Sequence, residues 1–364
     1  MFIYIFILFL LFILGLGEVN NSIKRRKTKP LFIGLIFFFW ILSFIRWETG
    51  TDWDSYYDFF RNNFNLLDFQ NRLFEPFYTY IAYFVKQLTD EYWVLLMIYS
   101  AIIYVLVTPT LLKYSPLPFV SLILYFLLRK ADIFFTRESI ALAFCLFSIK
   151  YIEKRKLFPF LITVLIGVQF HKSVVVFLPA YFIYSLRLST KQIFIIVGIF
   201  FVISFAAINV LKDYLLSISY LLGDVYEDKA ESYMDRGDET FGYGVSLQRS
   251  LIQGVINNGL FLLLFAYTLK KENTPFIKGL LNLYAFSIVL LFVTLPLSLT
   301  LSRVYNSYNL VSILLIGHTF NCFMKKNVSF YYLLFFFYIS VRFSMQTFFG
   351  GYSYCFVPFK SILW

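Results

Sequence analysis

Charged residues are scarce in this sequence. They make up 15% of its 364 residues, whereas 60% are hydrophobic, and the mean hydropathy is +0.73. Soluble domains carry about 25% charged and about 45–50% apolar residues. The scarcity of charge therefore excludes an ordinary soluble domain and indicates a chain that lies within a membrane.

Cysteines and nucleotide-binding motifs are scarce as well. The three cysteines, Cys145, Cys322 and Cys355, are far apart, and neither a CxxC nor a Cys/His spacing occurs. An odd, scattered set argues against a disulfide framework and against a zinc site. No Walker A, GxGxxG or HExxH motif is present, so nucleotide-driven transport and zincin chemistry have no support.

Long apolar runs are abundant instead. Runs of about 15–20 residues predict about twelve spans, at residues 2–17, 31–45, 92–112, 117–129, 137–151, 157–170, 174–187, 192–211, 249–269, 279–298, 304–323 and 328–345. The first run has neither a basic flank nor a small-x-small cleavage site, so we expect a retained span. The sequence thus predicts an all-α polytopic integral membrane protein with about twelve transmembrane helices and one domain over residues 1–364.

The net charge is +11, and many of the basic residues that produce it lie in every second short loop. This is the positive-inside pattern, which places these loops in the cytoplasm and calls for no nucleic acid. Both termini and the loops at about 46–91 and 212–248 are then expected outside. The basic loops contain Lys24 to Lys27 with Lys29, Lys113, Lys150 with Lys154 to Lys156, Arg187 with Lys191, Lys270 and Lys271 with Lys278, and Lys325 with Lys326.

The segment LFEPFYTYIAYFVKQL (73–88) tests this topology, because a further span here would reverse every loop after it. It contains Glu75, Pro76 and Lys86 and is strongly aromatic. We expect an amphipathic helix lying at the outer interface.

Charged residues nevertheless close or open several spans on the predicted outer side. Arg46, Arg137, His171, Arg249 and Arg303 are the main ones. Snorkelling to headgroups explains any single arginine, and a lone histidine is often structural. A convergent set indicates an anionic partner, and the planar guanidinium fork suits phosphate.

The first outer loop has a different composition. RWETGTDWDSYYDFF (46–60) mixes four carboxylates with aromatic residues. One interpretation is a solvated loop. The other is a site in which a carboxylate acts as a base and aromatic rings stack on sugars.

Five motifs carry a family resemblance: RxxxGTDWxxYxxxF (46–60), FEPFYxYI (74–81), RESIALAF (137–144), FHKSVVVFLP (170–179) and SRVYNSY (302–308). In this order they resemble the EpsG family of Wzy-like polymerases of bacterial exopolysaccharide, capsule and O-antigen repeat units. Lys172 fills the middle position of H-x-S. The 212–248 loop holds no motif of the family, and it is either a lid over the site or a plain surface loop.

The resemblance implies glycosyl transfer between undecaprenyl-pyrophosphate-linked oligosaccharides on the outer leaflet of the bacterial cytoplasmic (inner) membrane. By analogy it also implies a GT-C-like helical bundle, with a base in the first outer loop. The expected base is Asp52, then Glu48, then Asp54. The expected pyrophosphate-binding residues are Arg137, His171, Arg249, Arg303 and Arg46, and the expected sugar-stacking residues are Trp47, Trp53, Tyr56 and Tyr57.

The resemblance implies no cofactor; a divalent metal bridging to pyrophosphate is the less favoured alternative. Membrane lipids, a flippase, a chain-length regulator and an export system are the implied partners. Two other functions stay open. An O-antigen-type ligase or lipid-phosphate-sugar-dependent glycosyltransferase differs only in its acceptor. A transporter or flippase needs polar groups near the bilayer midplane.

Overall fold

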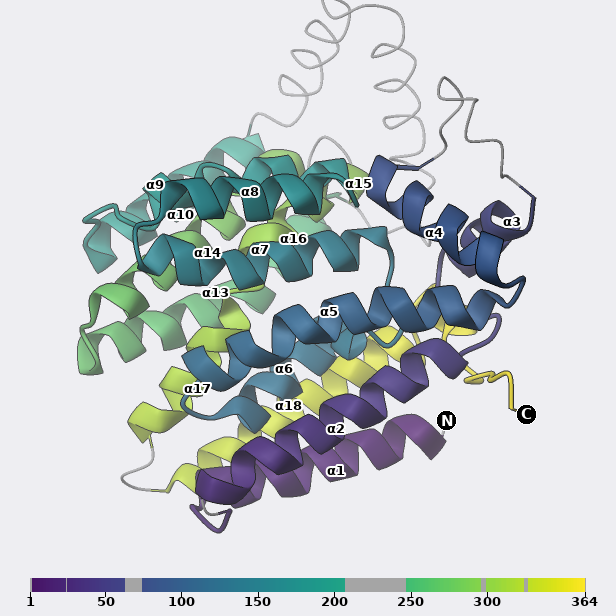
Figure 1. Cartoon of the computed structure of the whole chain (residues 1–364). Helices are drawn as coiled ribbons and strands as arrows, with labels where there is room; N and C mark the ends of the chain where they lie inside the picture. The colour runs from purple at the N-terminus through teal and green to yellow at the C-terminus, as the bar shows by residue number, and fades with distance from the viewer. Residues whose placement is uncertain are drawn as a thin grey trace, which may run out of the picture. The chain divides into compact units, whose positions relative to one another are not determined.

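The computed structural model describes residues 2–23, 25–62, 74–206, 247–295, 299–323 and 327–363 (Figure 1). The regular secondary structure in these ranges is helical throughout, apart from one isolated β-bridge between Arg46 and Ser361. The α-helices are α1 (Phe2–Val19), α2 (Arg25–Ile45), α3 (Trp53–Asn62), α4 (Pro76–Leu88), α5 (Tyr92–Tyr114), α6 (Pro118–Arg129), α7 (Arg137–Glu153), α8 (Leu157–Val168), α9 (Ala180–Ile183), α10 (Thr190–Ala206), α13 (Leu247–Lys271), α14 (Pro275–Thr294), α15 (Leu299–Ser302), α16 (Asn306–Asn309), α17 (Ser312–Phe323) and α18 (Val328–Thr347). The 3₁₀-helices are η2 (Lys130–Asp132), η3 (Lys172–Phe177), η4 (Arg303–Tyr305) and η5 (Ser353–Cys355).

Six of these helices are long and apolar enough to cross a membrane, and they are α1, α2, α5, α13, α14 and α18. An α-helix satisfies its own backbone hydrogen bonds, so it is the element that an apolar chain can place in lipid. Shorter apolar helices occupy other predicted spans, namely α8, η3 with α9, α10 and α17. The all-α membrane class is confirmed, while the count of twelve spans and the GT-C-like arrangement stay predictions.

Helix starts follow local sequence signals. Proline occupies the first turn of α4, α6 and α14, where a backbone N–H would have no partner within the helix. Thr136 and Ser139 form a reciprocal capping box at the start of α7. Such a box satisfies two backbone N–H groups that the first turn leaves open, and it fixes where the Arg137 side chain leaves the helix.

The chain divides into two compact units. Unit 1 comprises Met1–Leu178 and Ile313–Trp364, and unit 2 comprises Pro179–Ser312. The prediction of one polytopic domain is not tested by this division. The predicted outer loop at 212–248 lies almost entirely outside the described residues.

In unit 1, α1 packs against α6 and α18, α2 against α5, and α7 against α5 and α8. Both chain termini lie at the same end of this bundle (Figure 1). Gly167 lets α8 approach α7 closely, because a Cβ there would lie 3.2 Å from the carbonyl oxygen of Ala141. Stacked rings of Phe39, Phe126 and Phe343 fill the core between α2, α6 and α18.

In unit 2, α14 is the central helix and packs against α10 and α13. Asn282 on α14 donates to the carbonyl oxygen of Leu186 at 2.7 Å, which ties the helix to the chain after α9. Gly279 lies beneath the ring of Tyr184, where any Cβ would clash.

The predicted interfacial helix at 73–88 is present as α4. It has 13 residues, which is short of the roughly 20 that a span requires. Tyr78, Ala82 and Val85 are buried along one side, while Phe84 and Leu88 are exposed. A helix of this length with one apolar exposed side fits the interfacial interpretation, which stays a prediction.

Candidate functional site

The loop between α2 and α3 holds the acidic stretch, and the C-terminal segment of the chain fixes its backbone. The N–H of Trp47 donates to the carbonyl of Lys360 at 2.9 Å, and the N–H of Gly50 donates to that of Cys355 at 2.8 Å. Gly50 has φ of +110°, a conformation that suits glycine. The loop is therefore a fixed platform, although it is irregular in conformation.

Arg46 lies under this platform. It is 1% exposed, its Nη2 donates to the carbonyl of Phe135 at 3.0 Å, and its Nη1 donates to that of Thr49 at 3.3 Å. Its guanidinium also lies over the Phe135 ring, 4.7 Å from the centroid. Two of its donors thus hold two backbone segments together, its Nε has no hydrogen-bond partner, and its role in binding pyrophosphate stays a prediction.

Asp52 and Arg137 are brought together by Tyr56. The Tyr56 hydroxyl lies 3.4 Å from Oδ2 of Asp52, to which it donates, and accepts from the backbone N–H of Arg137 at 3.3 Å. Burial raises the pKa of Tyr56, and the charge of Asp52 adds to this, while Arg137 lowers it. The hydroxyl therefore stays protonated near neutral pH and remains a donor to Asp52.

The guanidinium of Arg137 pairs with a carboxylate that the sequence analysis did not select. Nη1 of Arg137 forms an ion pair with Oε2 of Glu75, and the two side chains are 19% and 10% exposed. The guanidinium lies 4.1 Å from the centre of the Phe74 ring. Nε of Arg137 is buried and has no hydrogen-bond partner. Arg137 is thus held by the ion pair with Glu75 and by contact with the Phe74 ring, and its Nε–H makes no hydrogen bond.

Glu75 joins a third segment to this cluster. Its Oε1 accepts from the backbone N–H of Lys172 at 3.3 Å. The neighbouring His171 caps η3, with Nδ1 lying 2.6 Å from Oγ of Ser173. His171 is therefore next to the cluster along the chain, while Glu75 makes the actual contact. Asp52, Tyr56, Arg137, Glu75 and the Lys172 N–H form one chain of polar contacts, called here the Asp52–Lys172 chain.

A strained turn lies between α6 and α7. Lys130, Ala131 and Asp132 all have φ near +50°, which is costly for residues with a Cβ. Asp132 compensates, since its buried carboxylate accepts from Tyr125 and forms an ion pair with Arg129 at 3.2 Å. This turn was not identified from the sequence, and it explains Arg129 as a structural residue.

The other two candidate bases are placed differently from Asp52. Glu48 has φ of +45° and forms an exposed ion pair with Lys360 at 2.7 Å. Asp54 is exposed in the first turn of α3. The C-terminal segment lies against the same loop, since the carbonyl of Cys355 accepts from the N–H of Gly50, two residues before Asp52.

The four candidate sugar-stacking rings divide into two groups. Trp53 and Tyr56 are each 5% exposed. Trp53 stacks on Tyr57 with centroids 4.8 Å apart, and Trp47 packs edge-on against both. Trp47 and Tyr57 are half-buried. Trp53 and Tyr56 therefore pack and link in this arrangement, while Trp47 and Tyr57 keep partly exposed rings, and the sugar-stacking role of all four stays a prediction.

The remaining arginines belong to unit 2. Arg303 is exposed at the start of η4. Arg249 lies in α13, and its side chain falls outside the described part of the chain. The structure therefore joins Asp52, Tyr56 and Arg137 directly, and the convergence of the full arginine set stays a prediction.

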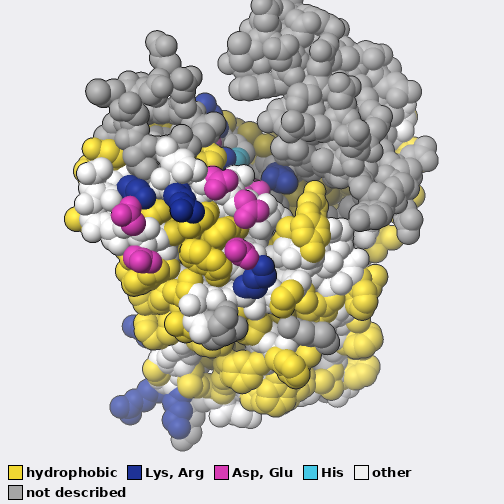
Figure 2. Space-filling view, turned by 90° about the vertical axis from the view of Figure 1, so that its right-hand side faces the viewer, with side chains coloured by type: hydrophobic (Ala, Val, Ile, Leu, Met, Phe, Trp, Pro, Cys, Tyr) yellow, Lys and Arg dark blue, Asp and Glu magenta, His cyan; other side chains and the backbone are white. Residues whose placement is uncertain are grey.

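The surface charge is mixed. Figure 2 shows acidic and basic side chains gathered close together, above a surface that is mostly hydrophobic.

Within the described ranges, no group of three or more His, Cys, Asp or Glu is arranged to hold a metal ion. Arg137 supplies a positive charge and Asp52 a carboxylate at this cluster, and their roles as anion binder and base, like the absence of a cofactor, stay predictions.

Comparison with known proteins adds the family. The EpsG family model matches residues 29–361, which covers every element of the Asp52–Lys172 chain. No curated protein and no solved structure matches the sequence. Because the family match spans nearly the whole sequence, this chain belongs to the EpsG family.

Proposed function

We propose that this protein joins undecaprenyl-pyrophosphate-linked oligosaccharide units into a surface polysaccharide, by glycosyl transfer at the Asp52–Lys172 chain. Membership of the EpsG family associates this membrane protein with polysaccharide biosynthesis. The polymerase activity, the lipid-linked substrates and the outer-leaflet location are parts of the proposal. The product is a capsule, an exopolysaccharide or an O-antigen.

One observation carries the proposal: a single tyrosine hydroxyl links the carboxylate of Asp52 to the backbone of Arg137, the residue that bears the guanidinium. Tyr56 contacts Oδ2 of Asp52 and the backbone N–H of Arg137. Glycosyl transfer needs a base near the attacking hydroxyl and positive charge near the departing group. Asp52 and Arg137 supply these two needs from neighbouring positions.

In the proposed step, the acceptor sugar hydroxyl attacks the anomeric carbon of the donor glycan. A new glycosidic bond forms while the bond from the anomeric carbon to the pyrophosphate oxygen breaks. The proton of the hydroxyl goes to Asp52, and the bonding electrons leave with the pyrophosphate. Arg137 stabilises the charge that develops there, because preorganised donors act strongly on a charge formed in the transition state.

Glu75 fits this scheme as a positioning residue. It holds Nη1 of Arg137 and the backbone of Lys172 at once, so it fixes the guanidinium before substrate binds. A guanidinium has five N–H donors, and Nε of Arg137 makes no hydrogen bond. Donors therefore remain for phosphate oxygens.

Trp47 and Tyr57 are the proposed sugar-contacting rings, since both are half-buried at the edge of the aromatic cluster. His171, Arg303 and Arg249 stay in the proposal as further pyrophosphate-binding residues. An outer position in the predicted topology supports all three. His171 also directly precedes Lys172, whose N–H donates to Glu75. A flippase, a chain-length regulator and an export system remain the proposed partners.

A deletion strain profiled for surface glycan length and for lipid-linked intermediates tests this function. A polymerase deletion removes long chains and leaves single repeat units on the outer surface. A ligase deletion leaves polymer on the lipid carrier instead. Lipid-linked units held on the cytoplasmic side would overturn the proposal in favour of a flippase.

A further inference from the structure

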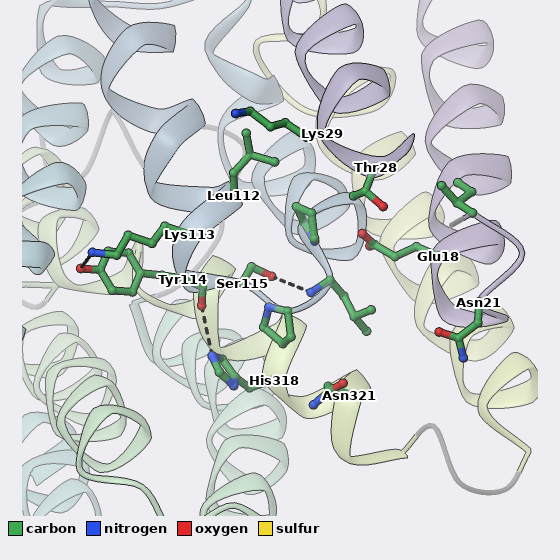
Figure 3. Close-up of a pocket in the computed structure, with 14 residues that line it drawn as sticks. Glu18, Asn21, Thr28, Lys29, Leu112, Lys113, Tyr114, Ser115, His318 and Asn321 are labelled. Carbon is green, nitrogen blue, oxygen red and sulfur yellow. Dashed lines mark hydrogen bonds between the residues drawn. The ribbon is translucent and has the colours of Figure 1, made fainter. Parts of the chain in front are cut away.

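A second polar site lies at the opposite end of unit 1 from the Asp52–Lys172 chain. Its cavity has a volume of about 660 Å³ and is lined by the end of α1, the start of α2, the junction of α5 with α6, and α17 (Figure 3). Three of these helices, α1, α2 and α5, are long enough to span a membrane. The cavity therefore opens where spanning helices end, at the level of lipid headgroups.

Glu18 forms the buried side of this cavity. It is 6% exposed, and its Oε2 accepts from the backbone N–H groups of Phe119 and Val120 at 2.9 and 3.1 Å. Its Oε1 is buried and has no hydrogen-bond partner. Figure 3 shows the carboxylate pointing toward Thr28, on the cavity side of α1. A buried acceptor without a partner is costly, so Oε1 needs a donor from a bound group.

The mouth of the cavity has the opposite charge. Lys29 and Lys113 are exposed there, together with the amides of Asn21 and Asn321. Nζ of Lys113 donates to the hydroxyl of Tyr114 at 2.9 Å. The ammonium of Lys113 is thus engaged with Tyr114, so Lys29 is the lysine left for a ligand. One ammonium group at the mouth and one carboxylate at the base favour a ligand with an anionic part outside and a donor inside.

We propose that this cavity binds a phosphate ester whose other end donates a hydrogen bond, with the phosphate at Lys29 and an amine or hydroxyl at Oε1 of Glu18. Phospholipid headgroups with ethanolamine or glycerol have this chemistry, and so does a soluble phosphate such as glycerol 3-phosphate. A choline headgroup has the phosphate and lacks the donor. The site is independent of the glycosyl-transfer proposal, since it shares none of the residues of the Asp52–Lys172 chain.

Binding to the purified full-length protein tests this inference. The probes are short-chain phosphatidylethanolamine, phosphatidylglycerol and phosphatidylcholine, with glycerol 3-phosphate as the soluble arm. The ethanolamine and glycerol headgroups should bind about tenfold tighter than choline, the effect expected for one hydrogen bond to a charged group. Saturable binding of glycerol 3-phosphate at similar affinity assigns a soluble ligand, and its failure assigns the lipid.

Two variants separate the site from general lipid adsorption. Lys29→Ala should weaken binding of every phosphate probe about tenfold. The matched control is Lys27→Ala, which removes an exposed lysine of the same helix that does not line the cavity. Glu18→Gln should remove the preference for donor headgroups over choline. Equal binding of all three lipids to the unaltered protein, or equal loss in Lys29→Ala and Lys27→Ala, would overturn the proposal.

Discussion

Arg137 and Glu75 form an ion pair that joins the start of α7 to the start of α4, although the residues are 62 positions apart. The same Glu75 accepts from the Lys172 N–H, and Arg137 is linked to Asp52 through Tyr56. Four separate segments of the chain thus meet through two carboxylates, one guanidinium and one phenol.

The first prediction concerns the Arg137–Glu75 pair. Arg137→Ala should abolish polymer and lower the free energy of unfolding by about 3 kcal/mol, since it leaves a largely buried carboxylate unpaired. The double variant Arg137→Ala with Glu75→Gln should recover part of the stability and none of the activity. Thermal unfolding in detergent and in vitro polymer synthesis measure the two effects. Arg61→Ala, an exposed arginine of α3, is the control and should match the unaltered protein.

The second prediction separates the acids of the loop. Asp52→Asn should lower the polymerisation rate by about 10²–10⁴, the usual contribution of a positioned base. Asp54→Asn changes an exposed neighbour on the same loop and should keep most of the rate. The reverse order of the two variants would move the base to Asp54.

The third prediction concerns Glu48, which pairs with Lys360 on the surface. An exposed pair contributes about 0–1 kcal/mol, so Glu48→Gln and Lys360→Ala should change stability little. Both should keep polymerisation. Complete loss of polymer in Glu48→Gln with an unchanged melting temperature would restore Glu48 as the base.

The fourth prediction concerns the platform under the acids. A Cβ at Gly50 would lie 2.9 Å from Nη1 of Arg46, and φ there is +110°. Gly50→Ala should therefore cost about 1–3 kcal/mol of stability and reduce activity by shifting Asp52. Gly34→Ala is the matched control, since open space surrounds that glycine, and it should be neutral or slightly stabilising.

The fifth prediction concerns metal. If arginine side chains neutralise the pyrophosphate alone, polymer synthesis by the purified protein should continue in excess EDTA. Restoration of activity by Mg²⁺ or Mn²⁺ after EDTA has removed it would show that a divalent cation takes part.

The sequence predicted the all-helical class because apolar runs are local signals. Proline and the capping residues at 136 and 139 are also local, and they could have placed the helix starts. It also selected Asp52 and Arg137, since a carboxylate and an arginine at span ends are unusual on the predicted outer side. It did not predict that Arg46 is buried and donates to the carbonyl of Phe135, 89 residues away. Nothing near Arg46 in the sequence indicates that contact.

The sequence around Glu75 contains a signal that could have identified this residue. It directly precedes Pro76 at the start of α4, and the FEPFYxYI motif contains it. A carboxylate at a helix start is common for local reasons, so the motif alone did not distinguish it. The platform formed with residues 355–362 could not be predicted, because backbone hydrogen bonds between distant segments leave no side-chain pattern.

The central claim is that the Asp52–Tyr56–Arg137 cluster joins lipid-linked units into polymer. The most direct test complements a deletion strain with Asp52→Asn at normal expression and measures surface glycan length together with lipid-linked units. The account predicts single repeat units on the outer surface and no long chains. Long chains at the level of the unaltered protein would contradict it.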